Sequence, residues 1–119
     1  KFDDKGLVTA IAQDADNGQV LMVAYMNEES LRKTLDTGIM TYWSRSRSKL
    51  WVKGESAGNT QEVRWIRTDC DEDVLMLGVV QVGGACHLGY RSCFFRELQD
   101  GEWETVEEKV FDPDEVYGS

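Results

Sequence analysis

DCDEDVLMLGVVQVGGACHLGYRSC, residues 69–93, is the segment that decides how the rest of the chain is organised. Its central run, residues 74–82, is the most apolar in the protein and predicts a buried β-strand. Metal-binding side chains flank this strand on both sides and include every cysteine and the only histidine of the chain. They are Cys70, Cys86, Cys93, His87, Asp69, Asp71 and Asp73. This arrangement indicates a metalloenzyme.

Length and composition predict one soluble domain. A chain of 119 residues can bury a modest core, and its 41% hydrophobic and 29% charged residues are ordinary for a globular protein. No apolar run approaches the roughly 20 residues that a membrane span needs, and no signal peptide is visible. Three cysteines cannot all pair, so we expect reduced thiols and a cytoplasmic location. We therefore expect a single domain over residues 1–119 and no membrane partner.

The net charge of −9 is concentrated at the C-terminal end. Residues 97–119 carry nine acidic side chains and one lysine, whereas residues 1–96 are nearly neutral. A nucleic-acid-binding protein needs a basic surface that neutralises phosphates. We therefore expect no nucleic-acid partner.

Local signals predict a hairpin and a helix in the first third of the chain. Residues 7–13 and 19–25 are apolar runs around Asp16-Asn17-Gly18, a turn sequence that tolerates positive φ. Asn27 is a good helix N-cap, and Gly38 stands where a glycine ends a helix. One short helix should therefore cover one end of a sheet.

The remaining chain reads mainly as strands. We expect strands over residues 39–44, 61–67 and 74–82, with Val63 and Trp65 on one face of theirs, and a hairpin of residues 90–98 and 102–108. The glycine and serine content of residues 50–59 predicts a loop. The fold class predicted is α+β, mainly β: a small single domain of antiparallel strands with six or seven strands and one clear helix.

The cysteine spacing leaves two interpretations open. The pattern C-x15-C-x6-C lacks a CxxC pair, so spacing alone favours buried structural thiols over a metal site. However, Cys86 adjoins His87 in a glycine-rich loop, where backbone can approach an ion closely. Three protein ligands with an open fourth position are typical of catalytic zinc.

The aspartates alternate as Asp69, Asp71 and Asp73, which would place three carboxylates on one face of an extended segment. Oxygen-rich clusters suit Mg²⁺ or Ca²⁺. A solvated acidic turn is the alternative. An EF-hand is excluded because Val74 and Val80 stand where that loop needs Gly and Glu.

Basic and aromatic residues gather between positions 43 and 53. Arg45, Arg47, Lys49 and Lys53 form either a solvated loop or a clamp for phosphate. Trp43 and Trp51 either pack in the core or stack on a base. His87 is either an exposed loop residue or, beside a zinc-bound water, a group that exchanges a proton near neutral pH.

Taken together, six ordered motifs resemble the phosphoribosyl-AMP cyclohydrolase family of histidine biosynthesis. They are Tyr42-Trp43-Ser44-Arg45-Ser46-Arg47, Leu50-Trp51-Val52-Lys53-Gly54-Glu55, Gly58-Asn59, Asp69-Cys70-Asp71-x-Asp73, Ala85-Cys86-His87-x-Gly89 and Ser92-Cys93-Phe94. The resemblance covers roughly residues 7–96. Ala57, Gly84 and Leu88 depart from the family's usual residues, but none replaces an expected metal ligand.

The resemblance implies hydrolysis of the N1–C6 bond in the adenine ring of 1-(5-phosphoribosyl)-AMP. It implies zinc on Cys70, Cys86 and Cys93, Mg²⁺ on Asp69, Asp71 and Asp73, and His87 as the catalytic proton acceptor. Substrate contacts are expected from Trp43, Arg45, Arg47, Trp51, Lys53, Glu55 and Asn59. The resemblance further implies an intertwined homodimer with a shared zinc site, Cys70 coming from one chain and Cys86 and Cys93 from the other.

Two rival functions remain open. A deaminase-like enzyme would use the same kind of zinc-activated water, but its H-x-E…P-C-x-x-C signature is absent. A non-catalytic zinc-binding module would not need the basic, tryptophan-flanked loop.

Overall fold

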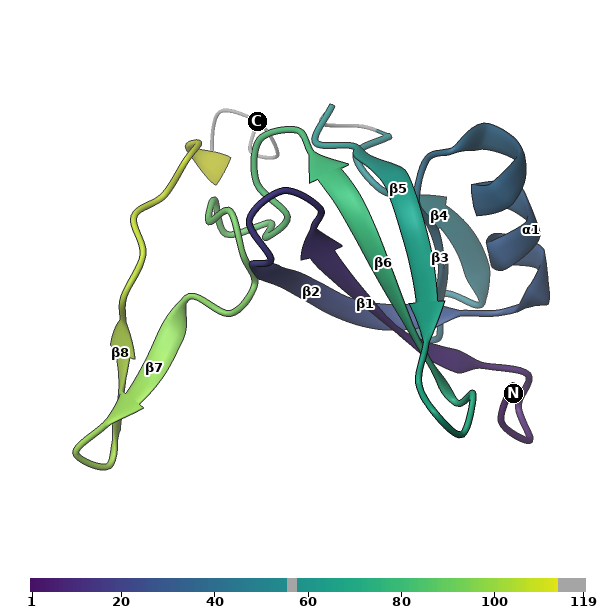
Figure 1. Ribbon diagram of the computed structural model, residues 1–119. Helices are drawn as coiled ribbons and strands as arrows, with labels where there is room; N and C mark the ends of the chain where they lie inside the picture. Colours follow the sequence, from purple (N-terminus) through teal and green to yellow (C-terminus); the bar gives the residue numbers. More distant parts are fainter. Residues whose placement is uncertain (56–57, 114–119) are drawn as a thin grey trace.

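A six-stranded sheet forms the body of the protein, and a two-stranded hairpin stands beside it (Figure 1). The computed structural model describes residues 1–55 and 58–113. The strand order in the large sheet is β4-β3-β2-β1-β6-β5. The elements are β1 (Val8–Asp14), β2 (Val20–Met26), α1 (Glu28–Thr37), β3 (Thr41–Ser44), β4 (Lys49–Val52), β5 (Gln61–Thr68), β6 (Val74–Gln81), β7 (Arg96–Gln99) and β8 (Glu102–Thr105).

The predicted fold class is confirmed, with two differences in detail. The described residues contain eight strands where six or seven were expected, and β1 pairs with β6 in parallel while every other ladder is antiparallel. In the same part of the chain, no helix is long and apolar enough to cross a membrane. Ala57 and the end of the acidic segment, residues 114–119, lie outside the described residues.

The hairpin of β1 and β2 forms as its turn sequence predicts. Asp14 closes the turn, because its Oδ1 accepts the backbone N–H groups of Asp16 at 2.8 Å and Asn17 at 3.1 Å. Gly18 has the positive φ, 79°, that glycine adopts at low cost. The sheet therefore begins from a locally encoded unit.

Helix α1 is closed at both ends by the predicted caps. The Asn27 side chain accepts the Ser30 N–H at 2.8 Å, and the Asn27 N–H is donated to the Ser30 hydroxyl at 2.8 Å. Gly38 ends the helix in the left-handed region and donates to the Thr34 carbonyl. Thr34 also accepts the Thr41 N–H at 3.0 Å, which ties the helix to β3.

Strand β6 is the buried centre of the sheet, as its apolar run predicts. It lies between β1 and β5, and none of its residues is exposed. The small Ala10 and Ala12 of β1 stand beside Leu75 and Leu77 of β6, and this face packs into the hydrophobic core. Core packing thus fixes the strand that leads into the cysteine-containing loop.

The prediction that Val63 and Trp65 share a face is wrong. The ladder register shifts between them: Val63 pairs with Val79, but Trp65 pairs with the adjacent Gly78. Val79 and Gly78 are neighbours in β6 and therefore point to opposite faces of the sheet. Because paired residues share a face, the β-bulge places Val63 and Trp65 on opposite faces. The Trp65 ring occupies the space above Gly78, where an added Cβ would lie 2.1 Å from indole Cε2.

Two further expectations are corrected by long-range contacts. Residues 49–52 form β4 in place of part of the predicted loop, because Leu50 and Trp51 pair with Trp43 and Tyr42 of β3. Residues 90–95 form no strand, because their polar groups bond elsewhere. One such bond runs from the Cys93 N–H to the Leu21 carbonyl at 2.7 Å.

Candidate functional site

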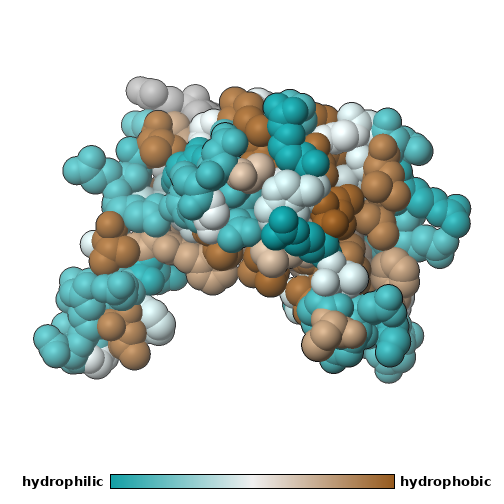
Figure 2. Space-filling view, in the orientation of Figure 1, coloured by the Kyte–Doolittle hydropathy of each residue, from teal (hydrophilic) through white to brown (hydrophobic). Residues whose placement is uncertain are grey.

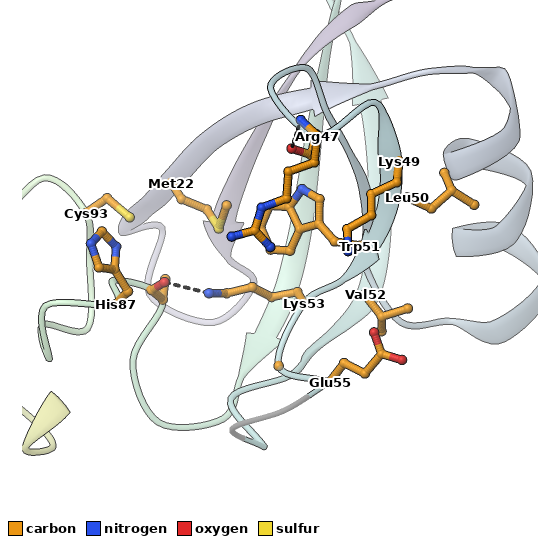
Figure 3. Close-up of a pocket in the computed structure, with 13 residues that line it drawn as sticks. Met22, Arg47, Lys49, Leu50, Trp51, Val52, Lys53, Glu55, His87 and Cys93 are labelled. Carbon is orange, nitrogen blue, oxygen red and sulfur yellow. Dashed lines mark hydrogen bonds between the residues drawn. The ribbon is translucent and has the colours of Figure 1, made fainter. Parts of the chain in front are cut away.

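A cavity of about 480 Å³ lies between the β3–β4 region and the loop that follows β6 (Figure 3). Six of the residues predicted to form the site line it: Arg47, Trp51, Lys53, Glu55, His87 and Cys93. Its other lining side chains include Lys49, which the sequence analysis gave as part of a possible phosphate clamp, and Met22, Ser44 and Leu50, which were not predicted as site residues. Two segments far apart in the sequence are thus joined into one concave surface.

The cysteine loop, residues 83–95, forms one wall of the cavity. Backbone bonds close it on itself: Cys86 N–H is donated to the Tyr90 carbonyl at 3.1 Å, and Gly89 N–H to the Cys86 carbonyl at 3.1 Å. The Leu88 N–H points at the Cys86 sulfur, and the nitrogen and sulfur atoms lie 3.4 Å apart. Burial raises the pKa of the Cys93 thiol to about 11, and the negative charge of neighbouring Cys86 adds to this rise. Two thiols therefore share one small space.

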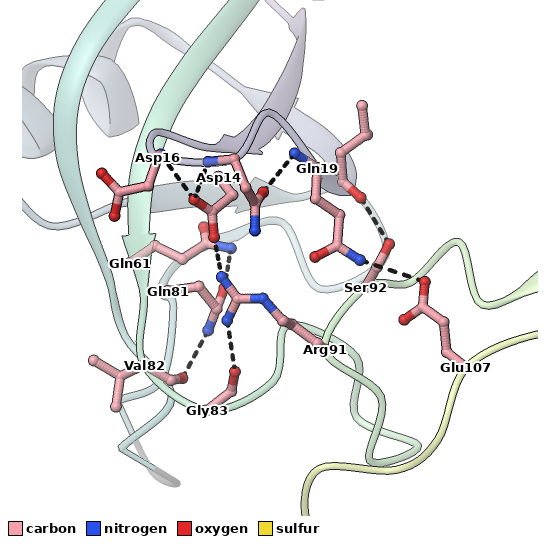
Figure 4. Close-up of polar contacts among 12 residues, drawn as sticks. Asp14, Asp16, Gln19, Gln61, Gln81, Val82, Gly83, Arg91, Ser92 and Glu107 are labelled. Atoms are coloured by element: carbon pink, nitrogen blue, oxygen red, sulfur yellow. Dashed lines mark hydrogen bonds and ion pairs between the residues drawn. The ribbon is translucent and has the colours of Figure 1, made fainter.

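Polar contacts fasten the cysteine loop to the first hairpin (Figure 4). The Ser92 hydroxyl donates to the Val20 carbonyl at 2.7 Å, and Arg91 forms an ion pair with Asp14. Burial alone would disfavour the Asp14 carboxylate, but the two turn N–H groups and the Arg91 guanidinium outweigh it and hold the Asp14 pKa below its usual value. The Asp14–Arg91 pair was not foreseen. The only feature of the sequence that could have indicated this pair is the position of Arg91 between the candidate zinc ligands Cys86 and Cys93.

Lys53 crosses the cavity and joins its two walls. Its ammonium donates a hydrogen bond to the Ala85 carbonyl at 2.6 Å, and the residue is 8% exposed (Figure 3). Burial holds the pKa of Lys53 below its ordinary value, and the nearby Cys93 and Cys86 oppose this shift. The expected role of Lys53 in substrate binding stays a prediction, because its charged group already binds the residue next to Cys86.

A buried chain of hydrogen bonds lies behind Trp51 and supports that wall of the cavity. The Tyr42 ring lies 4.9 Å from that of Trp51, and its hydroxyl donates to Gln61 Oε1 at 2.7 Å. Gln61 Nε2 donates to Gln81 Oε1 at 2.7 Å, and Gln81 Nε2 donates to the Val82 carbonyl at 2.8 Å. Burial raises the pKa of Tyr42. These contacts link the wall that carries Trp51 to the start of the cysteine loop.

Three predicted substrate contacts lie outside the lining of the cavity. Trp43 pairs with Tyr25 of β2, and the Arg45 guanidinium lies 4.0 Å from the centre of the Tyr25 ring. Asn59 extends over the loop, and its Oδ1 would be 2.2 Å from a Cβ placed on Gly83. The structure therefore brings together Arg47, Trp51 and Glu55 but not these three.

The aspartates gather in the turn between β5 and β6, and the extended segment expected for them is not formed. Residues 70–71 are in a turn, and Glu72 has a φ of 61°. The turn still collects Asp69, Asp71 and Asp73 so that one carboxylate oxygen of each lies within 4.8 Å of the others. A hydrogen bond from the Asp73 carboxyl lowers the pKa of Asp69 to about 2, while the same contact raises the pKa of Asp73. Such crowded carboxylates are a candidate site for a hard cation.

Cys70 does not meet the other cysteines within one chain. It is exposed in the β5–β6 turn, at the opposite end of β6 from Cys86 (Figure 1). An eight-residue strand separates the two ends by about 26 Å, at about 3.3 Å per residue. The Cys86 and Cys93 thiols fit two ligand positions of a zinc site. The third cysteine cannot reach them within the same chain.

The class of the protein follows from this arrangement. A small mainly β domain whose cavity has basic residues on one wall, and a thiol with a histidine on the other, has the features of a hydrolase for a small phosphorylated molecule. The family follows from comparison with known proteins. The chain belongs to the phosphoribosyl-AMP cyclohydrolase family, whose model matches residues 22–95. This family consists of cyclic amidine hydrolases of histidine biosynthesis, and the predicted family is confirmed.

Curated relatives match over nearly the whole chain. A phosphoribosyl-AMP cyclohydrolase of Chromobacterium violaceum is 59% identical over 118 residues, covering 98% of this chain and 89% of the relative. Those of Chlorobaculum parvum and Salinibacter ruber are each 60% identical, covering 99% and 98% of this chain and 87% and 91% of the relatives.

Proposed function

We propose that this chain hydrolyses the N1–C6 bond in the adenine ring of 1-(5-phosphoribosyl)-AMP, giving the 5-formimino-type aminoimidazole carboxamide ribonucleotide. The observation that carries the proposal is the cavity itself, which combines Arg47 and Lys49 with Trp51 on one wall and His87 with Cys93 on the other. Its volume of about 480 Å³ falls in the range of small-molecule sites.

The basic wall suits the nucleotide. Arg47 and Lys49 can bind phosphate oxygens, Arg through a planar fork and Lys as a point charge. Trp51 offers an aromatic face for the purine, and Tyr42 and the buried hydrogen bonds behind it hold that face in place. Glu55 lies on the same wall and can accept hydrogen bonds from ribose hydroxyls.

The opposite wall suits the reacting carbon. Zinc would be held by Cys86, Cys93 and the Cys70 of a second copy of the chain, and when bound it supplies Lewis-acid activation of a water molecule. Within this chain, Leu88 N–H holds the Cys86 sulfur and the Lys53 ammonium offsets the negative charge of the thiolates. Three thiolates leave little positive charge on zinc, so a separate proton acceptor is needed.

His87 is that proton acceptor. Figure 3 shows it beside Cys93 at the end of the cavity, and neutral imidazole can accept a proton near neutral pH. The ribosyl group on N1 leaves the purine ring positively charged. This charge makes C6 electrophilic and makes N1 a competent leaving group. His87 would accept the proton of the attacking water as the N1–C6 bond opens.

The magnesium site accompanies the third cysteine. Asp69, Asp71 and Asp73 occupy the same turn as Cys70, so the contact that would bring Cys70 to the cavity of a second copy would also bring this carboxylate cluster. Mg²⁺ held there would lie close to the substrate's phosphate or ribose. A homodimer with two shared sites therefore explains both the distant Cys70 and the exposed aspartates.

Ring opening of phosphoribosyl-AMP tests the proposal directly. Purified protein with measured zinc content should change the purine absorbance of this substrate and leave AMP untouched. His87→Ala should lower kcat by roughly 10²–10⁴ while zinc stays bound. Release of ammonia would identify the deaminase-like alternative. Zinc binding without turnover would identify the non-catalytic module.

A further inference from the structure

The chain returns to the body after the β7–β8 hairpin and runs along the cysteine loop. Figures 1 and 2 show the hairpin standing clear of the body, and in Figure 1 the segment after β8 comes back to the loop that follows β6. Two contacts fix its course: the Val106 N–H is donated to the Phe95 carbonyl at 2.9 Å, and Lys109 forms an antiparallel bridge with Tyr90. We call residues 106–113 the strap; none of them lines the cavity.

The strap binds the last residue of the turn that carries Cys86 and His87. The Gly89 carbonyl accepts the Val110 N–H at 2.7 Å and the Phe111 N–H at 3.3 Å. The Gly89 N–H is in turn donated to the Cys86 carbonyl at 3.1 Å, which closes the turn. Hydrogen bonds therefore connect the strap to the backbone of a candidate zinc ligand.

Two buried glycines let the strap approach this loop closely. A Cβ placed on Gly84 would lie 2.9 Å from Cε1 of Phe111 and 3.0 Å from Cγ2 of Val110. One placed on Gly89 would lie 2.5 Å from the Phe111 carbonyl oxygen. Gly89 also has a φ of 101°, which glycine adopts at low cost. The strap therefore packs directly on the backbone of the cysteine loop.

The position of His87 depends on the backbone of this turn. His87 is exposed, and in the part of the chain that the structure describes no hydrogen bond to its ring is found. Catalytic bases are commonly oriented by a third group. Here that task falls to the turn, whose Gly89 end is bound by the strap.

We propose that the strap is a positioning element: Val110 and Phe111 hold Gly89, and thereby set where Cys86 binds zinc and where His87 accepts a proton. Gly89 follows His87 by two positions and Cys86 by three, so a shift of its backbone moves both groups. This inference rests on the proposed roles of Cys86 and His87. It assigns part of the acidic C-terminal segment a place in the site.

Substitution of Phe111 tests the strap against a control at its other end. Phe111→Ala removes the ring over Gly84 and should weaken zinc binding and lower kcat, each by about 10-fold or more, while KM stays nearly unchanged. Phe111→Leu keeps an apolar group over Gly84 and should restore most of both. Val106→Ala, whose native side chain is 48% exposed, should change neither by more than about three-fold.

Competition with a chelator measures the zinc affinity, and steady-state kinetics separates kcat from KM. Urea unfolding shows how far each variant is destabilised. A purely stabilising strap would lower the free energy of unfolding in Phe111→Ala and leave zinc affinity and kcat at their wild-type values. That result would overturn the proposal.

A backbone change covers the case in which Phe111→Ala fails to fold. Semisynthesis can replace one backbone N–H by an ester oxygen, which removes a single hydrogen bond and leaves every side chain in place. At Val110 the change removes the hydrogen bond to Gly89 and should weaken zinc binding by about 3–10-fold.

The same change at Val106 is the matched control, because it removes the hydrogen bond to Phe95 at the other end of the strap. It should lower stability by a similar amount and leave zinc affinity unchanged, since the neighbouring ligand Cys93 is held by its own hydrogen bond to Leu21. Equal zinc affinities in the two esters would overturn the proposal.

The outcomes separate the strap from the proposed function. A wild-type protein that binds zinc without opening phosphoribosyl-AMP would refute the ring-opening chemistry, and weakened zinc binding in Phe111→Ala would still support the strap. An active wild-type protein whose zinc affinity and kcat are unaffected by Phe111→Ala would keep the chemistry and overturn the strap. Absence of zinc binding by the wild-type protein would overturn both.

Discussion

The Lys53 ammonium and the Ala85 carbonyl oxygen lie 2.6 Å apart and connect the two walls of the cavity. Ala85 immediately precedes Cys86, so this hydrogen bond sets the position of a candidate zinc ligand from the opposite side of the site. Charged groups that orient ligands in this way tune metal affinity without touching the metal.

Lys53→Met should therefore weaken zinc binding by about 10–100-fold, since it keeps the length of the side chain but removes the donor. Competition with a chromogenic chelator measures the affinity. Lys49→Met is the control, because Lys49 lines the same cavity but is exposed; it should raise KM and leave zinc affinity unchanged. Unchanged zinc affinity in Lys53→Met with a raised KM would return Lys53 to the substrate-binding role predicted from the sequence.

Asp14 should make stability depend on pH in the acid range. Its folded pKa lies below the unfolded value of about 3.9, so its contribution is fully present above that value and is lost as the pH falls through the folded pKa. Asp14→Asn should cost about 2 kcal/mol at pH 7, because a buried charge-assisted contact with Arg91 is removed. Urea unfolding at pH 7 and at low pH should show the difference from wild type shrinking with acidification. Asp16→Asn, exposed in the same turn, is the control and should show neither effect.

Asp71→Asn should raise the Mg²⁺ concentration needed for activity while zinc content stays intact. Carboxylate oxygens are hard ligands that bind Mg²⁺, whereas thiolates are soft ligands that bind zinc. Loss of one carboxylate should therefore weaken Mg²⁺ binding and leave zinc in place. Glu72→Gln in the same turn is the matched control and should leave the Mg²⁺ titration unchanged. If Asp71→Asn lost zinc without any change in Mg²⁺ dependence, the carboxylates would serve only to brace Cys70.

Mixed dimers of two inactive variants should recover activity. Cys70→Ala and Cys93→Ala homodimers each lack a ligand at both sites. A mixed dimer has one site with both lesions and one intact site. Random reassortment makes half the dimers mixed, so about a quarter of wild-type activity should return after co-refolding. No recovery, with mixed dimers confirmed by mass spectrometry, would refute the shared zinc site.

Locally encoded features were predictable from sequence, and features made by distant contacts were not. The β1–β2 turn and the caps of α1 at Asn27 and Gly38 are satisfied by residues within a few positions, so their signals are visible in the chain. Strand β4 depends on pairing with β3, and the shape of residues 90–95 depends on bonds to β2. No local pattern carries that information.

The candidate site shows the same division. Residue identity alone pointed to His87, Cys93 and Trp51, and the structure places all three at one cavity. The aspartates cluster as expected, but in a turn with a left-handed Glu72 in place of an extended segment. The hydrogen bond between Lys53 and Ala85 joins positions 32 residues apart. The partner of the Lys53 ammonium depends on which loops meet in the fold, so the sequence motif could not reveal this hydrogen bond.

The Trp65 indole packs directly over Gly78, and the two positions are therefore not free to vary separately. Any side chain at position 78 would collide with the indole, whose Cε2 lies 2.1 Å from the place of a Cβ. A larger residue at position 78 would require the Trp65 indole to move or to be replaced, and a smaller residue at position 65 would leave the space above Gly78 unfilled. The two positions are thus coupled, because a substitution at either one changes which residues the other can accommodate.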